Sequence, residues 1–368
     1  MRSTVSGPTA LVVVALVFAA CAGGGPGGAS VSAVPSAAPP ASQAPATPPP
    51  ASEPPPSVAP AAEQYVANAA DFVDAANWDT KKTVTIELAE MSFTPKDVTL
   101  EAGQPYVLEV VNTGTVKHEF TAEDFMRTVA TRKAETAETE VKVPFFTEIE
   151  VFAGKKAELF LIPLIPGTYK LVCEIEGHYE AGMFGTITVT GATPASPALQ
   201  LADVASGPWV QDGAALVKAA DWDKKQELTI DLSEFAFTPK DFTLTAGQPY
   251  VLKVPSVGDV KHEFTAGDFF NSVAFRKAED ASAEFKAPAP REVEAFAGKT
   301  VELYLIPTKA GTYDLVCEIE GHFEAGMFGT ITVTVARDLT RWNLSVWVWL
   351  VGRRIDDFRP CRPRTDGR

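Results

Sequence analysis

The sequence is poor in histidine and cysteine, and this scarcity disfavours several kinds of site. Only four histidines and four cysteines occur among 368 residues, and no CxxC or CxxCH arrangement is found. A dithiol redox site, a zinc ribbon and an attached haem are therefore disfavoured. Basic residues are also few, because 32 Lys and Arg stand against 47 Asp and Glu, which gives a net charge of −15. Nucleic-acid binding needs a basic face and is disfavoured for that reason.

All four histidines and two of the cysteines belong to a pattern that occurs twice. The segment Cys-Glu-Ile-Glu-Gly-His begins at Cys173 and again at Cys317, and each copy continues to Glu-Ala-Gly-Met. His118 and His262 lie upstream in identical Val-Lys-His-Glu-Phe segments. Each residue of the first set is 144 positions before its counterpart. A repeat of this length indicates duplicated domains rather than a solenoid, whose units are shorter.

The same offset extends over most of the chain and defines its organisation. Trp78 recurs as Trp222, and the segment Phe-Thr-Pro-Lys-Asp occurs at both 93–97 and 237–241. We predict a first domain over residues 63–191, a linker over 192–208 and a second domain over 209–335. Two non-motif methionines, Met91 and Met126, become Phe235 and Phe270, which is typical of core positions, whereas Met183 and Met327 are both Met.

Within each copy the hydrophobic pattern is mostly that of β-strands. Some segments alternate apolar and polar residues, and others are short apolar runs bounded by Gly and Pro; in the first copy they are 83–88, 106–111, 157–162, 167–173 and 185–190. Short strands with turn signals between them favour a Greek-key sandwich. We therefore predict an all-β protein with two tandem sandwiches. Two helices are also expected, one over 123–135 and a short amphipathic one before Trp78.

The two ends of the chain differ in composition from the repeats. Residues 1–20 contain a short apolar run and are predicted to be a signal peptide. Cys21 follows in a segment that resembles a bacterial lipobox, so we expect lipidation there, with simple secretion as the alternative. Residues 21–62, rich in Pro and Ala, are predicted to be a disordered linker. Residues 336–368 are an atypical basic, Trp-rich tail, for which an interfacial anchor and a segment without selected function both stay open.

The repeated pattern offers donors that suit copper. Each copy supplies a thiolate, an imidazole and a thioether from one loop after a predicted strand, and a second imidazole from an earlier strand end. Two imidazoles and one thiolate with a weak axial Met form the blue-copper arrangement. Soft sulfur favours Cu(I) and imidazole accepts Cu(II), so such a site needs little rearrangement when an electron moves. A purely structural role, a zinc site and a Cys–His nucleophile are the alternatives.

Both copies resemble cupredoxins, and the spacing C-x4-H-x4-M is similar to that of rusticyanin-like and sulfocyanin-like members. The resemblance implies a Greek-key sandwich of about eight strands, one-electron transfer, and one copper ion in each repeat. It also implies two ligand sets, which are His118, Cys173, His178 and Met183, and His262, Cys317, His322 and Met327. The acidic residues that precede Gly-His depart from many relatives and leave the reduction potential and the partner open.

These features predict an exported electron carrier of the cell envelope, anchored by lipid and facing the periplasm or the exterior. Copper storage or delivery is the alternative function. An enzyme is not expected, because the two sites use every histidine and leave none for a type 2 or trinuclear copper centre. Six glutamates flank the loops and form either a solvated rim or a docking surface for a basic partner such as a cytochrome or a terminal oxidase; they are Glu174, Glu176, Glu180, Glu318, Glu320 and Glu324.

Overall fold

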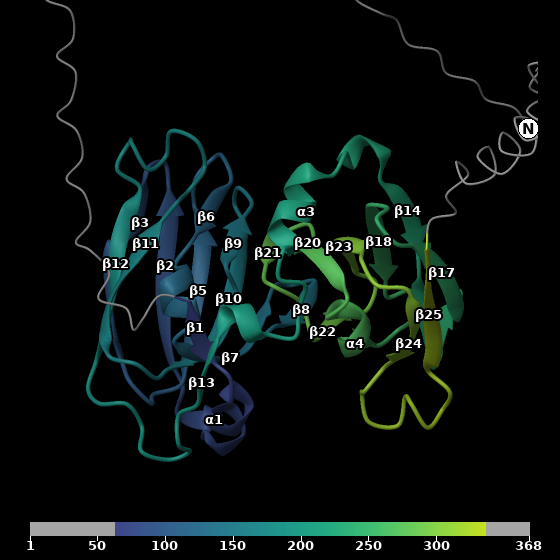
Figure 1. Cartoon of the computed structure of the whole chain (residues 1–368). Helices are drawn as coiled ribbons and strands as arrows, with labels where there is room; N and C mark the ends of the chain where they lie inside the picture. The colour runs from purple at the N-terminus through teal and green to yellow at the C-terminus, as the bar shows by residue number, and fades with distance from the viewer. Residues whose placement is uncertain (1–62, 336–368) are drawn as a thin grey trace, which may run out of the picture. The chain divides into compact units, whose positions relative to one another are not determined.

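The computed structural model describes residues 63–335. The predicted signal peptide, the lipidation of Cys21, the Pro- and Ala-rich linker and the Trp-rich tail lie outside the described residues. Strands dominate the described part, and the few helices are short (Figure 1). The predicted all-β fold class is confirmed. Among residues 63–335, no helix has the length and apolar character needed to span a membrane.

The first repeat consists of eleven strands and three short helical segments. The strands are β2 (Lys82–Ala89), β3 (Ser92–Thr94), β4 (Asp97–Glu101), β5 (Tyr106–Asn112), β6 (His118–Phe120), β7 (Val129–Glu135), β8 (Thr139–Lys142), β9 (Glu148–Val151), β10 (Lys156–Pro163), β11 (Gly167–Val172) and β12 (Phe184–Thr190). The helical segments are α1 (Ala69–Ala75), η1 (Trp78–Thr80) and α2 (Glu123–Met126). All five strand segments predicted for this repeat are present within a residue or two.

The second repeat has the same elements 144 residues later, except that the counterpart of β2 is divided into β14 and β15. Its strands are β14 (Gln226–Thr229), β15 (Asp231–Ser233), β16 (Ala236–Thr238), β17 (Asp241–Thr245), β18 (Tyr250–Pro255), β19 (His262–Thr265), β20 (Val273–Glu279), β21 (Ala283–Lys286), β22 (Glu292–Ala295), β23 (Thr300–Pro307), β24 (Gly311–Val316) and β25 (Phe328–Thr334). Its helical segments are α3 (Gly213–Ala219), η3 (Trp222–Lys224) and α4 (Gly267–Phe270).

The two helix predictions have different outcomes. The short helix before Trp78 is confirmed as α1, whose Phe72 is buried. The helix predicted over 123–135 is wrong, because only α2 is helical and β7 follows it directly. The Glu, Ala, Arg and Lys of this segment suit a helix locally, but β7 pairs with β10 and buries Val129 and Ala134. Burial against a neighbouring strand outweighs the weak local propensity.

Both sheets of the sandwich continue from one repeat into the other. One sheet has the strand order β3-β2-β5-β10-β7-β8-β22-β19-β24-β25-β17, and another runs β14-β18-β23-β20-β21-β9-β6. A bridge between Thr121 and Val172 connects β6 to the three-stranded sheet β11-β12-β4. The repeats therefore meet at two antiparallel strand pairs, β8 with β22 and β21 with β9. We call these two pairs the seam.

The seam is symmetric. Val141 pairs with Val293 in one half, and their counterparts Phe285 and Ile149 pair in the other. Thr136 and Asp280 occupy equivalent positions, 144 residues apart, and the Thr136 hydroxyl donates to the buried Asp280 carboxylate at 2.5 Å. The two repeats therefore pair edge to edge around an approximate two-fold axis. They form part of one compact unit and share a continuous hydrophobic core.

The segment between the repeats, predicted as a linker over 192–208, contains regular structure. Residues Leu201–Asp203 form β13, which pairs with β1 (Gln64–Val66), and η2 (Val204–Ser206) follows. Just beyond it, the buried side chain of Trp209 packs against Tyr65 and Phe145. These contacts hold the connecting segment against the seam.

Candidate metal centres

The structure brings together the two histidines and the cysteine of each predicted set. His118 begins β6, Cys173 directly follows β11, and His178 lies in the loop that leads to β12. One ligand atom from each of the three residues lies within 4.8 Å of the others. Cys173 Sγ is 3.3 Å from His178 Nδ1, and the two imidazole centroids are 5.1 Å apart.

The second repeat reproduces this arrangement. His262, Cys317 and His322 form a group with the same 4.8 Å limit. Cys317 Sγ lies 3.3 Å from His322 Nδ1, and the two imidazole centroids are 5.0 Å apart. The Nδ1 atoms of the two histidines are also 3.3 Å apart. The two copies of the sequence pattern thus give nearly identical geometry.

The two predicted methionines lie in the core beside these groups. Met183 is fully buried, its backbone N–H donates to the His178 carbonyl at 3.0 Å, and its carbonyl accepts from Cys173 at 3.1 Å. Met327 makes the same two hydrogen bonds with His322 and Cys317. Gly177, at φ +84°, turns the first loop back toward its cysteine, a conformation that glycine adopts without steric cost.

Several donor atoms of these groups have no partner within the described residues. Both ring nitrogens of His118 and Nε2 of His262 are buried and accept or donate no hydrogen bond among residues 63–335. Buried polar atoms are nearly always satisfied in folded proteins, so orphaned imidazole nitrogens need an explanation. Since neutral imidazole nitrogens and thiolates are metal ligands, a bound ion would satisfy them. The residues present fit a metal ion of mixed sulfur and nitrogen preference.

Electrostatics in the two groups support the same interpretation. Burial lowers the pKa of His118 and of His262, with a further contribution from the neighbouring imidazole, so each ring favours its neutral, ligating form. Burial also raises the pKa of the Cys173 and Cys317 thiols. A thiolate at these positions therefore needs a nearby cation, which a metal ion would supply.

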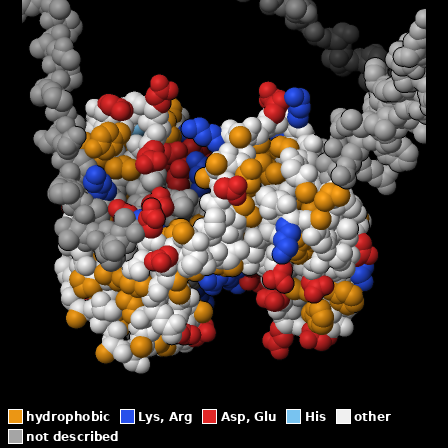
Figure 2. Space-filling model, in the orientation of Figure 1, with side chains coloured by type: hydrophobic (Ala, Val, Ile, Leu, Met, Phe, Trp, Pro, Cys, Tyr) orange, Lys and Arg blue, Asp and Glu red, His pale blue; other side chains and the backbone are white. Residues whose placement is uncertain are grey.

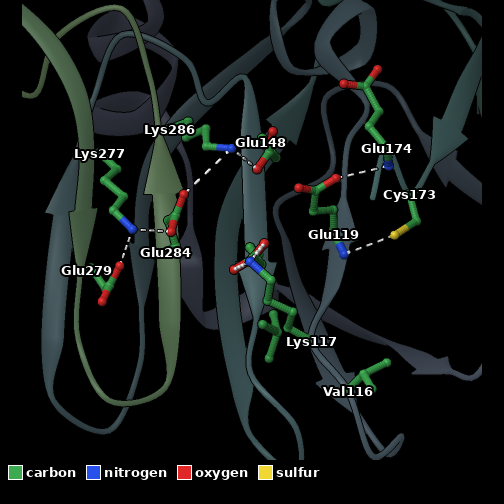
Figure 3. Close-up of polar contacts among 12 residues, drawn as sticks. Val116, Lys117, Glu119, Glu148, Cys173, Glu174, Lys277, Glu279, Glu284 and Lys286 are labelled. Atoms are coloured by element: carbon green, nitrogen blue, oxygen red, sulfur yellow. Dashed lines mark hydrogen bonds and ion pairs between the residues drawn. The ribbon is translucent and has the colours of Figure 1, made fainter. Parts of the chain in front are cut away.

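A buried glutamate that sequence reasoning missed lies directly behind each cysteine. Glu119 follows His118 on β6, its N–H donates to Cys173 Sγ at 3.4 Å, and its carboxylate accepts from the Glu174 N–H at 2.9 Å (Figure 3). Burial, followed by the neighbouring Glu148 carboxylate, raises the pKa of Glu119 to about 7. The identical His-Glu-Phe segments in both repeats were the only sequence signal for this residue.

Glu263 has the same position behind Cys317. Its N–H donates to Cys317 Sγ at 3.4 Å and its carboxylate accepts from the Glu318 N–H at 3.0 Å. Burial and the adjacent Glu292 raise the pKa of Glu263 to about 7. One glutamate thus contacts both the sulfur of each cysteine and the backbone N–H of the residue that follows it.

The raised pKa values of Glu119 and Glu263 predict a pH dependence for the metal-free protein. In the unfolded chain these carboxyls release their protons near pH 4.5, but in the folded chain they keep them up to about pH 7. The folded state therefore binds more protons between these values, and the stabilisation, complete below pH 4.5, is lost as the pH rises through 7. Relative to a Glu119→Gln, Glu263→Gln variant, the free energy of unfolding should fall by about 3 kcal/mol per site over this pH range.

Denaturant unfolding of the metal-free proteins between pH 4.5 and 7.5 measures this difference. Exposed Glu176→Gln, Glu320→Gln is the matched control, since it removes the same number of carboxylates, and its curve should run parallel to that of the wild type. Parallel curves for the Glu119, Glu263 variant would contradict the raised pKa values.

All six predicted rim glutamates are exposed on the loops after the cysteines. Figure 2 shows acidic side chains gathered with hydrophobic ones at the end of the second repeat where β24 joins β25. Phe235 is an exposed apolar side chain beside His322, which lies in the loop between β24 and β25. It is 44% exposed, lies in a turn at φ +63°, and its ring meets His322 edge-on at 5.2 Å. The prediction of Phe235 as a core position is therefore wrong, whereas Met126 and Phe270 are buried as expected.

Comparison with known proteins indicates a family for the first repeat. Residues 65–189 match the family of the cupredoxin-like domain. The copper-resistant cuproprotein CopI of Rubrivivax gelatinosus is 32% identical over 97 residues, which cover 26% of this chain and 59% of that protein. The chain thus spans less than two thirds of this curated relative.

Solved structures with some likeness also include copper proteins. The copper-containing nitrite reductase from Thermus scotoductus SA-01 is 14% identical, with 69% of this chain and 62% of that chain covered and a TM-score of 0.26. The auracyanin from Roseiflexus castenholzii is 18% identical, with 29% of this chain and 96% of that chain covered and a TM-score of 0.23. With TM-scores this low, these structures do not define the arrangement of the whole chain.

The all-β fold and the family match identify residues 65–189 as a cupredoxin-like domain. The second repeat has equivalent elements in the same order at an offset of 144 residues. The recognition of cupredoxin-like sequence from the spacing of Cys, His and Met is therefore confirmed.

Proposed function

We propose that this chain is a copper-binding electron carrier with two type 1 centres, one in each repeat. The observation that carries the proposal is the convergence of one buried thiol and two imidazoles in each repeat, with orphaned ring nitrogens that a metal would satisfy. Copper held by such donors cycles between Cu(I) and Cu(II). The first ion would be held by His118, Cys173 and His178 with Met183 beside them, and the second by the equivalent four residues.

The protein's own contribution is a rigid and dry site. The cysteine, the first histidine and the methionine of each set are fully buried in the sandwich. His178 and His322 are the members of each set nearest the solvent, since His118 and His262 are fully enclosed. We infer that electrons enter and leave through the edges of His178 and His322, where Tyr179 and the exposed Phe323 follow in the loops.

Spectroscopy of the copper-loaded protein tests this function. Two coppers per chain, intense thiolate-to-copper charge-transfer absorption and reversible bleaching by a one-electron reductant are expected. A protein that holds only colourless Cu(I) and releases it readily to a chelator would refute the carrier. Structural zinc sites use more thiolates or imidazoles than one Cys and two His, so zinc is not the expected metal. A protein that retains zinc and takes up no copper would also refute the carrier.

Copper storage or delivery is the second candidate function. The relative from Rubrivivax gelatinosus is named a copper-resistant cuproprotein, which favours a role in copper handling. That role requires exchange of Cu(I) with an acceptor rather than repeated oxidation and reduction in place. Transfer rates to a Cu(I) chelator, measured beside electron self-exchange rates, distinguish the two functions.

We further propose that the protein is not an enzyme and acts in the cell envelope. The sequence has four histidines, and the two candidate centres use all of them. The exposed acidic loops suit a basic redox partner, such as a cytochrome or a terminal oxidase, that docks by charge complementarity. The export and lipid anchoring predicted from the N-terminal sequence are tested by labelling cells with a lipid precursor and comparing the wild type with Cys21→Ser.

A further inference from the structure

A chain of charged side chains crosses the seam and ends behind each candidate copper centre. On the first side, Lys286 of the second repeat donates to the Glu148 carboxylate of the first repeat at 2.5 Å (Figure 3). Carboxylate oxygens of Glu148, Glu119 and Glu150 lie within 4.8 Å of one another. Since Glu119 contacts the Cys173 sulfur and the Glu174 N–H, the second repeat is connected to the first site through two glutamates.

The mirror-related chain serves the second site. Lys142 of the first repeat donates to the Glu292 carboxylate of the second repeat at 2.6 Å. Glu292 lies against Glu263, which in turn holds the backbone next to Cys317. Each repeat therefore supplies one lysine to the carboxylates behind the other repeat's site.

These lysines are needed because the carboxylates are buried. Glu119, Glu148 and Glu150 are 7%, 9% and 3% exposed. Within the first repeat, Lys117 pairs with Glu150 at 2.9 Å, but among residues 63–335 the ion-pair partner of Glu148 is Lys286 alone. A buried carboxylate that loses its partner is strongly destabilising. A single repeat on its own would leave Glu148 and Glu119 together without that cation.

We propose that each copper centre is completed electrostatically by the opposite repeat, with Lys286 tuning the first centre and Lys142 the second. This inference rests on the proposed function. Both lysines are positioning residues, because they act through the Glu148–Glu119 and Glu292–Glu263 pairs and touch no ligand. A positive charge behind the site favours Cu(I), which carries less charge than Cu(II), and so raises the reduction potential. The two centres are consequently not independent modules on one chain.

Single-site backgrounds allow each centre to be measured alone. In Cys317→Ser, where only the first centre can form, Lys286→Gln should lower the Cu(I)-to-Cu(II) affinity ratio about threefold, which is about 28 mV for a one-electron couple. Lys142→Gln is the matched control in that background and should leave the potential unchanged. In Cys173→Ser, where only the second centre can form, Lys142→Gln should lower this ratio and Lys286→Gln should leave the potential unchanged. Lys286→Arg keeps the charge and should restore the potential.

Two results would overturn the inference. One is an unchanged potential for Lys286→Gln in Cys317→Ser and for Lys142→Gln in Cys173→Ser. The other is an equal shift of both centres by either lysine variant. Failure of Lys286→Arg to restore the potential would also count against a charge effect. A general loss of structure cannot imitate the expected result, because the control lysine variant crosses the same seam at the equivalent position.

A metal-free measurement separates this inference from the proposed function. The Glu174 N–H is held by Glu119 and the Glu318 N–H by Glu263, at 2.9 and 3.0 Å. In the metal-free protein, Lys286→Gln should speed hydrogen exchange at the Glu174 amide about threefold and leave the Glu318 amide unchanged, and Lys142→Gln should do the reverse. If copper gives no type 1 spectrum but this exchange pattern holds, the function fails while the coupling stands. Equal exchange at both amides in both variants would refute the coupling.

Discussion

Cys173→Ser should remove about half of the intense visible absorption of the copper-loaded protein, and Cys317→Ser should remove the other half. The absorption arises from charge transfer between a thiolate sulfur and copper, and a serine oxygen cannot supply it. Since each cysteine lies in its own group with two histidines, the two losses should add, and the double variant should be colourless. Absorption spectra and copper analysis on the same samples measure both colour and metal content.

The matched control for this prediction is Glu176→Gln, an exposed position in the same loop. It should retain the full spectrum. If either single cysteine variant keeps all of the colour, the corresponding centre does not form a type 1 site. If either one loses all of it, the two centres depend on each other more strongly than the separate ligand sets allow.

Gly185→Ala should reduce the free energy of unfolding by about 3 kcal/mol. The reason is that an added methyl group is destabilising where the surrounding structure cannot relax. A Cβ at Gly185 would lie 1.9 Å from the Lys96 carbonyl oxygen. That carbonyl accepts a hydrogen bond from Thr186 at 3.1 Å, so it cannot move aside without loss of pairing between β12 and β4. Gly329 has the same 1.9 Å conflict with the Lys240 carbonyl oxygen, and Gly329→Ala should be equally damaging. Denaturant unfolding of the metal-free variants measures the effect.

Gly267→Ala is the control for both glycine variants. No atom lies within 4 Å of a Cβ at Gly267, and the equivalent position in the first repeat is Glu123. Its free energy of unfolding should change by less than about 0.5 kcal/mol. A similarly small change for Gly185→Ala would show that β12 and β4 can separate without cost, contrary to the close approach in the structure.

Much of the fold could be predicted from local patterns because those patterns report which faces are buried. Alternation over 83–88 and the β-branched residues of 185–190 mark strands whichever partners they have. The prediction failed at 123–135, where residues with helical propensity form β7. The outcome there depended on the availability of β10 as a partner, and no local feature of the segment records that partner.

The two candidate centres also combine residues that local sequence predicts with residues that only the tertiary structure reveals. The spacing of Cys173, His178 and Met183 predicts a common site because a short loop brings its own residues together. Glu119 was not predicted, because its importance comes from Cys173, 54 residues later, and from Glu148 on β9. Its further link to Lys286 depends on the packing of one repeat against the other.

The sequence by itself determined the duplication, the strand-rich character of each copy and the residue types available as ligands, since these follow from identity, spacing and hydrophobic period along the chain. Tertiary structure alone decided that both sheets continue across the seam and that lysines of one repeat reach the carboxylates of the other. The physical reason is that edge-strand pairing and burial of charge depend on which surfaces meet. Two nearly identical repeats offer several ways to meet, and only the packed structure selects one.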